Sequence, residues 1–210
     1  MLSKIFNTIA RKAMKDVLVM LDNGHGYDTP GKRSPKWKDG TQLYEYEFNR
    51  DIVRRIQILL KSEGIRCVVI TPEENDVPLS VRVKRANEYY RNNKDSFLVS
   101  VHANAGGGTG FEVWTSVGHT KSDDIASCFW NAMKTEFPDK KMRMDMTDGD
   151  VDKESNFYIL KNTKCPAVLT ENFFMDNEQD CKLIMSNDGR MRIAKAHVEA
   201  IKKAIQEVYK

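Results

Sequence analysis

The chain has 210 residues, which is enough for one domain with a sizeable core, whereas two full domains would be a tight fit. Hydrophobic residues make up 40% and charged residues 30%, a composition that is typical of globular proteins and excludes a disordered or fibrous chain. The formal net charge is only +3, so the sequence predicts no nucleic-acid partner. No apolar run approaches the roughly 20 residues that span a bilayer.

The first 15 residues differ from the rest of the chain in charge. They contain four basic residues and no acidic one, so the remainder is close to neutral. Apolar residues recur among them at helical spacing, at Leu2, Ile5, Phe6 and Ile9. We therefore expect a basic amphipathic helix over 1–15 that packs on the domain, with binding to a membrane surface as the alternative. Basic residues interrupt the segment throughout, so it lacks the apolar core of a secretory signal peptide.

Apolar runs and helical patterns alternate along the rest of the chain. The first elements in chain order are a buried strand at 17–21, a helix from Glu45 to about Glu63, a strand at 66–70 and a helix over about 79–90. The next are a buried strand at 97–101, a more alternating strand at 110–117 and a helix from Asp123 to about Phe137, with Ser122 as its N-cap. The last are strands at 157–160 and 166–170, a short helix over 177–185 and a longer helix over 191–208.

This alternation predicts a single α/β domain with a largely parallel sheet and helices on both faces. The segment 138–156 fits neither a strand nor a helix pattern, because it is rich in charged residues. We expect it to be a solvated loop, and its length makes it a candidate flap over a substrate.

Polar residues follow three of the predicted strands directly. The motifs are Asp22-Asn23-Gly24-His25-Gly26 after the first strand, His102-Ala103-Asn104 after the third, and Glu171-Asn172 after the last. Ligands of open α/β sheets bind beyond the carboxyl ends of the strands, so these side chains could converge. The glycines that flank His25 would let the backbone turn sharply and approach a ligand closely.

Two histidines and a carboxylate are a common ligand set of catalytic zinc, whose remaining position holds a water molecule. His25 and His102 are the histidines at strand ends, and the first long helix offers Glu45 or Glu47 at its N-terminus. The two glutamates point roughly 200° apart on a helix, and either could instead stabilise the helix dipole. We expect structural roles for the other two histidines, His119 in a loop and His197 on an apolar helix face.

Four motifs in order resemble the zinc-dependent N-acetylmuramoyl-L-alanine amidases of the type-3 family, which include cell-wall hydrolases and phage endolysins. The first is D-x-G-H-G at 22–26, and the second is a glutamate that begins a helix with an asparagine four residues on, Glu45 and Asn49. The third combines Leu79, Arg82 and Arg85-Ala86-Asn87 with S-x-H-x-N at 100–104. The fourth is E-x-G-F-x-x-N at 171–177. The chain departs from the family at Asn23, where proline is most frequent, and at Phe173, where glycine is usual.

The resemblance covers about residues 16–208 and implies a function. It implies a single three-layer α/β/α domain over 16–210 with a mostly parallel, mixed sheet of the phosphorylase/hydrolase type. It implies that His25, Glu45 and His102 hold Zn²⁺ and that Glu171 is the general base. The substrate would be peptidoglycan, cut at the amide between N-acetylmuramic acid and L-alanine of the stem peptide.

The resemblance also suggests weaker roles for other residues and leaves alternatives open. Asp22 would hydrogen-bond a histidine ligand, Asn104 would contact the substrate, and Arg143 would support the site or contact the substrate. One alternative is a zinc peptidase or carboxypeptidase of similar architecture, which would use Arg82, Arg85 or Arg143 to hold a terminal carboxylate. The other is a cell-wall-binding domain without catalysis.

The sequence also suggests where the protein acts. Because no signal peptide is recognised, we expect a protein that is made in the cytoplasm and acts on the cell wall after release. A phage or prophage lysis enzyme has this property, because another protein opens the membrane for it. We also expect it to be a monomer.

Overall fold

A computed structural model describes residues 16–209, so the helix predicted over 1–15 lies outside the described residues. The strands are β1 (Leu18–Asn23), β2 (Arg66–Val69), β3 (Ser96–Asn104), β4 (Phe111–Thr115), β5 (Lys153–Glu154) and β6 (Ala167–Phe174). The helices are α2 (Glu45–Ser62), α3 (Leu79–Asn92), α4 (Lys121–Glu136), α5 (Tyr158–Asn162), α6 (Glu178–Met185) and α7 (Asn187–Val208). No helix in this part of the chain is long and apolar enough to cross a membrane.

The strands form one mixed sheet in the order β2-β1-β3-β6-β4-β5. Strands β2, β1, β3 and β6 are parallel to one another, and β4 runs antiparallel to β6. The predicted mixed and mostly parallel sheet is therefore confirmed. The register places Asp22 beside Ser100 and His102 beside Glu171, so the polar motifs that follow the strands meet at one edge of the sheet.

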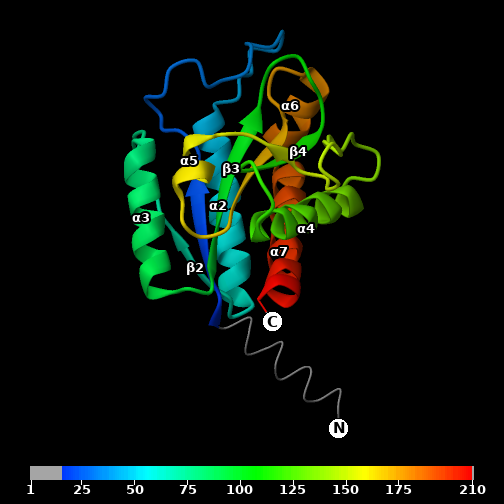
Figure 1. The fold of residues 1–210 in the computed structure, drawn as a ribbon. Helices are drawn as coiled ribbons and strands as arrows, with labels where there is room; N and C mark the ends of the chain where they lie inside the picture. The colour runs from blue at the N-terminus through cyan, green and yellow to red at the C-terminus, as the bar shows by residue number, and fades with distance from the viewer. Residues whose placement is uncertain (1–15, 210) are drawn as a thin grey trace.

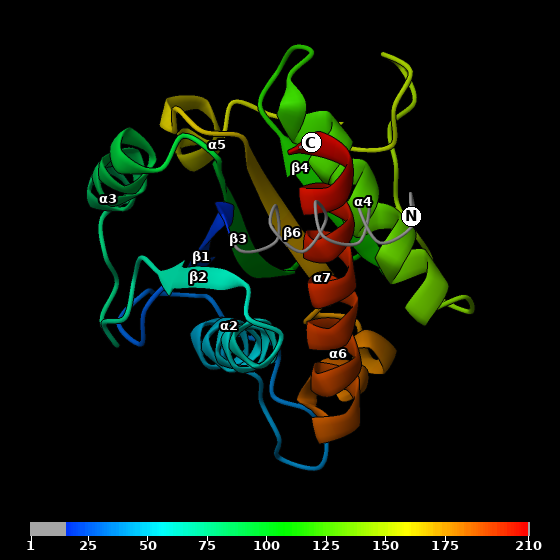
Figure 2. The same cartoon turned by 90° about the horizontal axis from the view of Figure 1, so that it is seen from below.

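The sheet is the middle of three layers (Figures 1 and 2). Helices α2, α4, α6 and α7 pack on one face, and α3 and α5 pack on the other. Strand β1 contributes to both cores because successive side chains point to opposite faces: Val19 and Leu21 join the first, and Leu18 and Met20 the second. The strand is buried on both faces, which explains its uninterrupted apolar sequence.

One predicted strand is wrong. Residues 157–160 lie at the start of α5, where Ile159 and Leu160 are buried on the α3 side of the sheet while Phe157 and Tyr158 are partly exposed. A run of four apolar residues is too short for its period to distinguish a strand from a helix turn.

Smaller corrections concern helix starts and the charged segment. Helix α4 begins at Lys121 with Thr120 as N-cap, because the Thr120 hydroxyl accepts the Ser122 N–H while Asp123 accepts the Thr120 N–H. Helix α7 begins at Asn187, earlier than predicted, with Ser186 as N-cap. The segment 138–156 is mostly loop, but it contributes β5, which pairs with β4.

Candidate metal centre

His25, Glu45 and His102 come together at the carboxyl edge of the sheet. Glu45 Oε1 lies 3.1 Å from Nδ1 of His102 and 3.4 Å from Nε2 of His25. The two imidazole rings meet edge to face, with their centroids 5.0 Å apart. Three potential ligand atoms from β3, α2 and the loop after β1 therefore converge on one point.

Helix α2 selects Glu45 over Glu47. Glu45 is the first residue of the helix and is buried, whereas Glu47 is exposed and accepts a hydrogen bond from the Tyr46 hydroxyl. One turn after Glu45, the Asn49 side chain donates to the Gly24 carbonyl oxygen at 3.0 Å. This bond ties the start of the helix to the loop that carries His25.

The loop after β1 holds His25 in an unusual backbone conformation. His25 has φ = 63°, in the left-handed region that few residues other than glycine adopt. The guanidinium of Arg50 donates to its carbonyl oxygen at 2.8 Å. Strained backbone of this kind is often found at functional sites, where surrounding contacts hold it in place.

His102 is oriented from its other nitrogen. Its Nε2 lies 3.2 Å from the Ser100 hydroxyl, which donates to Asp22 Oδ2 at 2.7 Å. Because the hydroxyl hydrogen is used on Asp22, Ser100 accepts from Nε2–H, and Nδ1 is the nitrogen that faces Glu45. The predicted contact between Asp22 and a histidine ligand is therefore wrong in one detail: Ser100 lies between them.

Asp22 is the centre of a buried network below the site. Besides Ser100, its carboxylate accepts from Thr71 at 3.0 Å and from Arg82 at 2.7 Å. Asp22 and Arg82 are 1% and 2% exposed, so this is a buried ion pair with additional hydrogen bonds. The sequence motifs contain Asp22, Arg82 and Ser100 separately, and the fold joins them.

The contacts within the cluster shift the pKa values of Glu45 and His102. Burial raises the pKa of Glu45, but hydrogen bonds from His102 and His25 outweigh burial and hold that pKa well below its usual value. Burial lowers the pKa of His102, and the hydrogen bond to Glu45 and the charge of Glu171 more than reverse this. The cluster therefore favours positive charge beside Glu45.

Glu171 provides a carboxyl group beside this cluster. It lies on β6 next to His102 in the register and is half-buried. Its Oε2 has no hydrogen-bond partner within residues 16–209, and burial raises its pKa to about 8. A cavity of about 440 Å³ is lined by Glu171, His25, His102 and Lys32. The sequence-predicted base thus faces the same hollow as the two histidines.

Asn104 and Arg143 meet elsewhere, on Glu112. The Asn104 amide donates to Glu112 Oε1 at 2.7 Å, and the Arg143 and Lys153 side chains donate to Oε2. Glu112 lies on β4 opposite Glu171. Sequence reasoning missed Glu112; the available signal was a lone acidic residue inside an apolar strand.

The arginines that a carboxypeptidase would need are occupied. Arg143 is bonded to Glu112 and packs on the Phe174 ring, Arg82 is buried against Asp22, and Arg85 is paired with Glu73. None of these three guanidinium groups is without a carboxylate partner. This disfavours the carboxypeptidase alternative.

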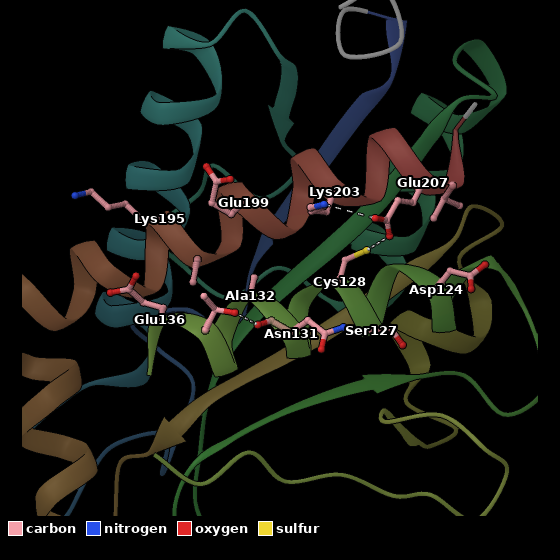
Figure 3. Close-up of a pocket in the computed structure, with 13 residues that line it drawn as sticks. Asp124, Ser127, Cys128, Asn131, Ala132, Glu136, Lys195, Glu199, Lys203 and Glu207 are labelled. Carbon is pink, nitrogen blue, oxygen red and sulfur yellow. Dashed lines mark hydrogen bonds and ion pairs between the residues drawn. The ribbon is translucent and has the colours of Figure 1, made fainter. Parts of the chain in front are cut away.

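A larger hollow lies away from these residues. It is a groove of about 640 Å³ between α4 and α7, lined by Lys195, Glu199, Lys203 and Glu207 from α7 and by α4 residues such as Cys128 (Figure 3). Burial raises the pKa of the Cys128 thiol to about 12, and its sulfur lies 3.7 Å from Glu207. An unreactive thiol and paired surface charges give this groove no catalytic chemistry.

An α/β/α domain with a His–Glu–His cluster and a buried carboxyl group at the carboxyl edge of its sheet is the arrangement of a hydrolase. The chain belongs to the N-acetylmuramoyl-L-alanine amidase family, whose model matches residues 19–203. The enzyme class predicted from the four motifs, a peptidoglycan amidase, is therefore confirmed.

Individual relatives agree with this assignment. The chain is 28% identical to the N-acetylmuramoyl-L-alanine amidase CwlM of Bacillus licheniformis, over 90% of this chain and 68% of the relative. It is 31% identical to an endolysin of Bacillus phage SPP1, over 88% of this chain and 64% of the endolysin.

Solved structures share the fold. The N-acetylmuramoyl-L-alanine amidase from Clostridium difficile 630 superimposes with a TM-score of 0.74 at 24% identity and covers 89% of this chain and 95% of its own. The amidase AmiC2 of Nostoc punctiforme gives 0.75 at 23% identity, over 91% and 98% of the two chains. The predicted fold class is confirmed.

Proposed function

We propose that this amidase cuts the bond between N-acetylmuramic acid and L-alanine with a zinc ion held by His25, Glu45 and His102. The spacing of the ligand atoms carries the proposal. Two ligands about 2.0–2.1 Å from a tetrahedral zinc are about 3.3 Å apart, and Glu45 Oε1 lies 3.1 and 3.4 Å from the two imidazole nitrogens. Glu45 Oε2 is also buried without a hydrogen-bond partner among the described residues. When bound, zinc polarises the scissile carbonyl and lowers the pKa of a coordinated water to about 7.

The residues around the ligands orient them. Ser100 and Asp22 fix the His102 ring so that Nδ1, not Nε2, faces Glu45. Asn49 and Arg50 hold the loop of His25 through the carbonyl oxygens of Gly24 and His25. Such outer contacts determine ring orientation and ligand basicity, so we assign them to binding rather than to proton transfer.

Glu171 moves the proton in our proposal. Its carboxyl group lines the cavity, and burial raises its pKa to about 8, so both of its protonation states are accessible near neutral pH. It accepts a proton from the attacking water at Oε2 and then gives it to the nitrogen of the leaving L-alanine. Because Glu171 is next to the metal ligands but is not itself a ligand, it can make both proton transfers without any change in the bonds to the ion.

Digestion of purified peptidoglycan tests the bond. We expect new L-alanine amino termini, and mass spectrometry of the released fragments should show intact sugars and free stem peptides. New reducing sugar ends without new amines would contradict the amidase assignment. The same spectra report which stem peptide is preferred.

Variants test the residue roles. We expect about one zinc per chain in the wild type, because the cluster forms one mononuclear site. Glu171→Gln should retain that zinc and lose about 10²–10⁴ of the rate, the usual contribution of a general base. Glu45→Gln should lose the metal, whereas exposed Glu47→Gln is the matched control and should retain both. A fully active Glu171→Gln variant would refute the assignment of the base.

We further propose that the protein acts as a lysis enzyme on peptidoglycan after release from the cytoplasm, as a monomer. The similarity to the endolysin of phage SPP1 supports this. Expression without a lysis partner should leave the protein in the cytoplasm. Accumulation in the periplasm under those conditions would contradict the proposal.

A further inference from the structure

A second group of potential metal ligands lies at the opposite edge of the sheet. Side-chain ligand atoms of His119, Asp123 and Asp150 all lie within 4.8 Å of one another. Asp123 is in the first turn of α4, and Asp150 belongs to the charged segment 138–156 that the amidase site leaves unexplained. Strand β4 ends at this edge with Thr115, one residue after Trp114, which pairs with Leu169. The parallel strands begin at the same edge.

Three carboxylate oxygens of this region are buried without hydrogen-bond partners. They are the Oδ1 atoms of Asp123, Asp150 and Asp152, none of which has a donor within residues 16–209. Asp123 is 6% exposed and Asp152 is 1% exposed. Their Oδ2 atoms are satisfied, by the Thr120 N–H for Asp123 and by the Thr115 hydroxyl for Asp152. Leaving a buried charged oxygen without a partner is costly, so each orphaned oxygen points to a missing proton or cation.

The carboxyl groups of Asp150 and Asp152 lie within hydrogen-bonding reach of each other. Burial and the neighbouring Asp150 raise the pKa of Asp152 to about 7. Two such groups need either a shared proton or a cation between them. Lys121 lines the adjacent hollow, but its ammonium extends over the Tyr209 ring. No Lys or Arg among the described residues forms an ion pair with the three aspartates.

We propose that Asp123 and Asp150, with Asp152 beside Asp150, bind a hard divalent cation of the calcium class. Oxygen atoms from three carboxylates are the ligands that such an ion prefers. Asp148, Asp150 and Asp152 alternate along the chain, which is the ligand spacing of the first half of a calcium-binding loop. His119 is 79% exposed and is hydrogen-bonded to Asp123 Oδ2, so it lies at the rim of the site and leaves the Oδ1 atoms to the ion.

The cation would give the charged segment a second attachment, at the edge of the sheet opposite the zinc site. At the carboxyl edge, Arg143 of this segment already bonds Glu112, and Met142 pairs with Phe111. At the other edge, the ion would join Asp150 and Asp152 to the first turn of α4. The segment beside Glu112 and Glu171 would then be ordered by calcium, independently of zinc.

Thermal unfolding of the zinc-loaded full chain tests this proposal, with CaCl₂, MgCl₂ or ZnCl₂ added at constant ionic strength. We expect Tm to rise with calcium concentration in the wild type. Asp150→Asn and Asp152→Asn should need at least tenfold more calcium for the same rise. Asp139→Asn, at an exposed position of the same segment, is the matched control and should respond as the wild type does.

Terbium binding provides a measurement that requires no variant. Terbium replaces calcium in oxygen sites, and its luminescence on tryptophan excitation should appear in the wild type and fall as calcium is added. A wild-type Tm that is independent of calcium, together with no competed terbium signal, would overturn the proposal. A response to zinc alone would also overturn it and would assign the cluster to a softer ion bound through His119. If Asp152→Asn stabilises the protein and its Tm responds to calcium as that of the wild type does, Asp150 and Asp152 share a proton and the proposal fails.

Discussion

Phe173 allows backbone strain to be separated from packing. It lies two residues after Glu171, at the position where the family motif has glycine, and its φ is 67°. An L-residue in this left-handed conformation costs roughly 1–2 kcal/mol, whereas glycine adopts it freely. The side chain nevertheless stays, because its ring is fully buried and meets the Phe137 ring edge to face, with centroids 5.1 Å apart.

Two substitutions distinguish the two effects. Phe173→Ala removes the ring, which costs about 3–5 kcal/mol, and keeps the strain. Phe173→Gly removes the same ring and relieves the roughly 1–2 kcal/mol of strain, but it gives the unfolded chain about 0.4–1 kcal/mol more conformational freedom. We therefore expect the glycine variant to be about 0.5–1 kcal/mol more stable than the alanine variant, although both are less stable than the wild type.

Urea unfolding and thermal unfolding of the two variants, side by side, measure the difference. At this chain length 0.5–1 kcal/mol corresponds to a Tm higher by roughly 1–4 °C for glycine. Ala132, inside helix α4, is the control: Ala132→Gly should lower stability by about 1 kcal/mol, the ordinary order of the two residues in a helix. If Phe173→Ala is more stable than Phe173→Gly by a similar amount, the conformation at 173 is not strained and the reasoning fails.

Two further predictions concern buried polar residues. Ser100→Ala should weaken zinc binding about 10–100-fold in competition with a chelator, because His102 loses the contact that orients its ring; an unchanged affinity would exclude a positioning role. Burial lowers the pKa of His197 from 6.5 to about 4, so the unfolded chain takes up a proton first and stability on the order of 3 kcal/mol is lost as pH falls from about 6.5 towards 4. His197→Gln should lack this loss. If the free energy of unfolding falls equally with pH in the two proteins over that range, His197 is not its cause.

The sequence was informative wherever burial imposed a clear pattern. Strands β1 and β3 are buried on both faces, so their uninterrupted apolar runs were unambiguous. Helix α2 alternates buried and exposed residues over 18 positions, which is long enough for the 3.6-residue period to emerge. The run at 157–160 was too short for either signal, and its helix exists because it packs against α3.

The ligand cluster was partly predictable for a topological reason. Parallel strands bring their carboxyl ends to one edge, so residues at the carboxyl ends of β1, β3 and β6 had to be neighbours once the strands were recognised. The partners of Glu112 could not be found in this way. Asn104, Arg143 and Lys153 reach it from three separate segments, and only the folded chain shows that they meet there.

The structure gives the glycines beside His25 a different role from the one that the sequence suggests. They were expected to allow a sharp turn, but the positive φ lies at His25 itself. Gly24 is required because a Cβ there would overlap the His102 ring. Gly24→Ala should therefore push His102 aside and weaken zinc binding. Gly40→Ala is the control, because its φ of +84° makes alanine strained while no atom lies near the new methyl group; it should lose stability but keep its zinc affinity. If Gly24→Ala binds zinc as tightly as the wild type does, then zinc affinity does not depend on the space that Gly24 leaves for the His102 ring.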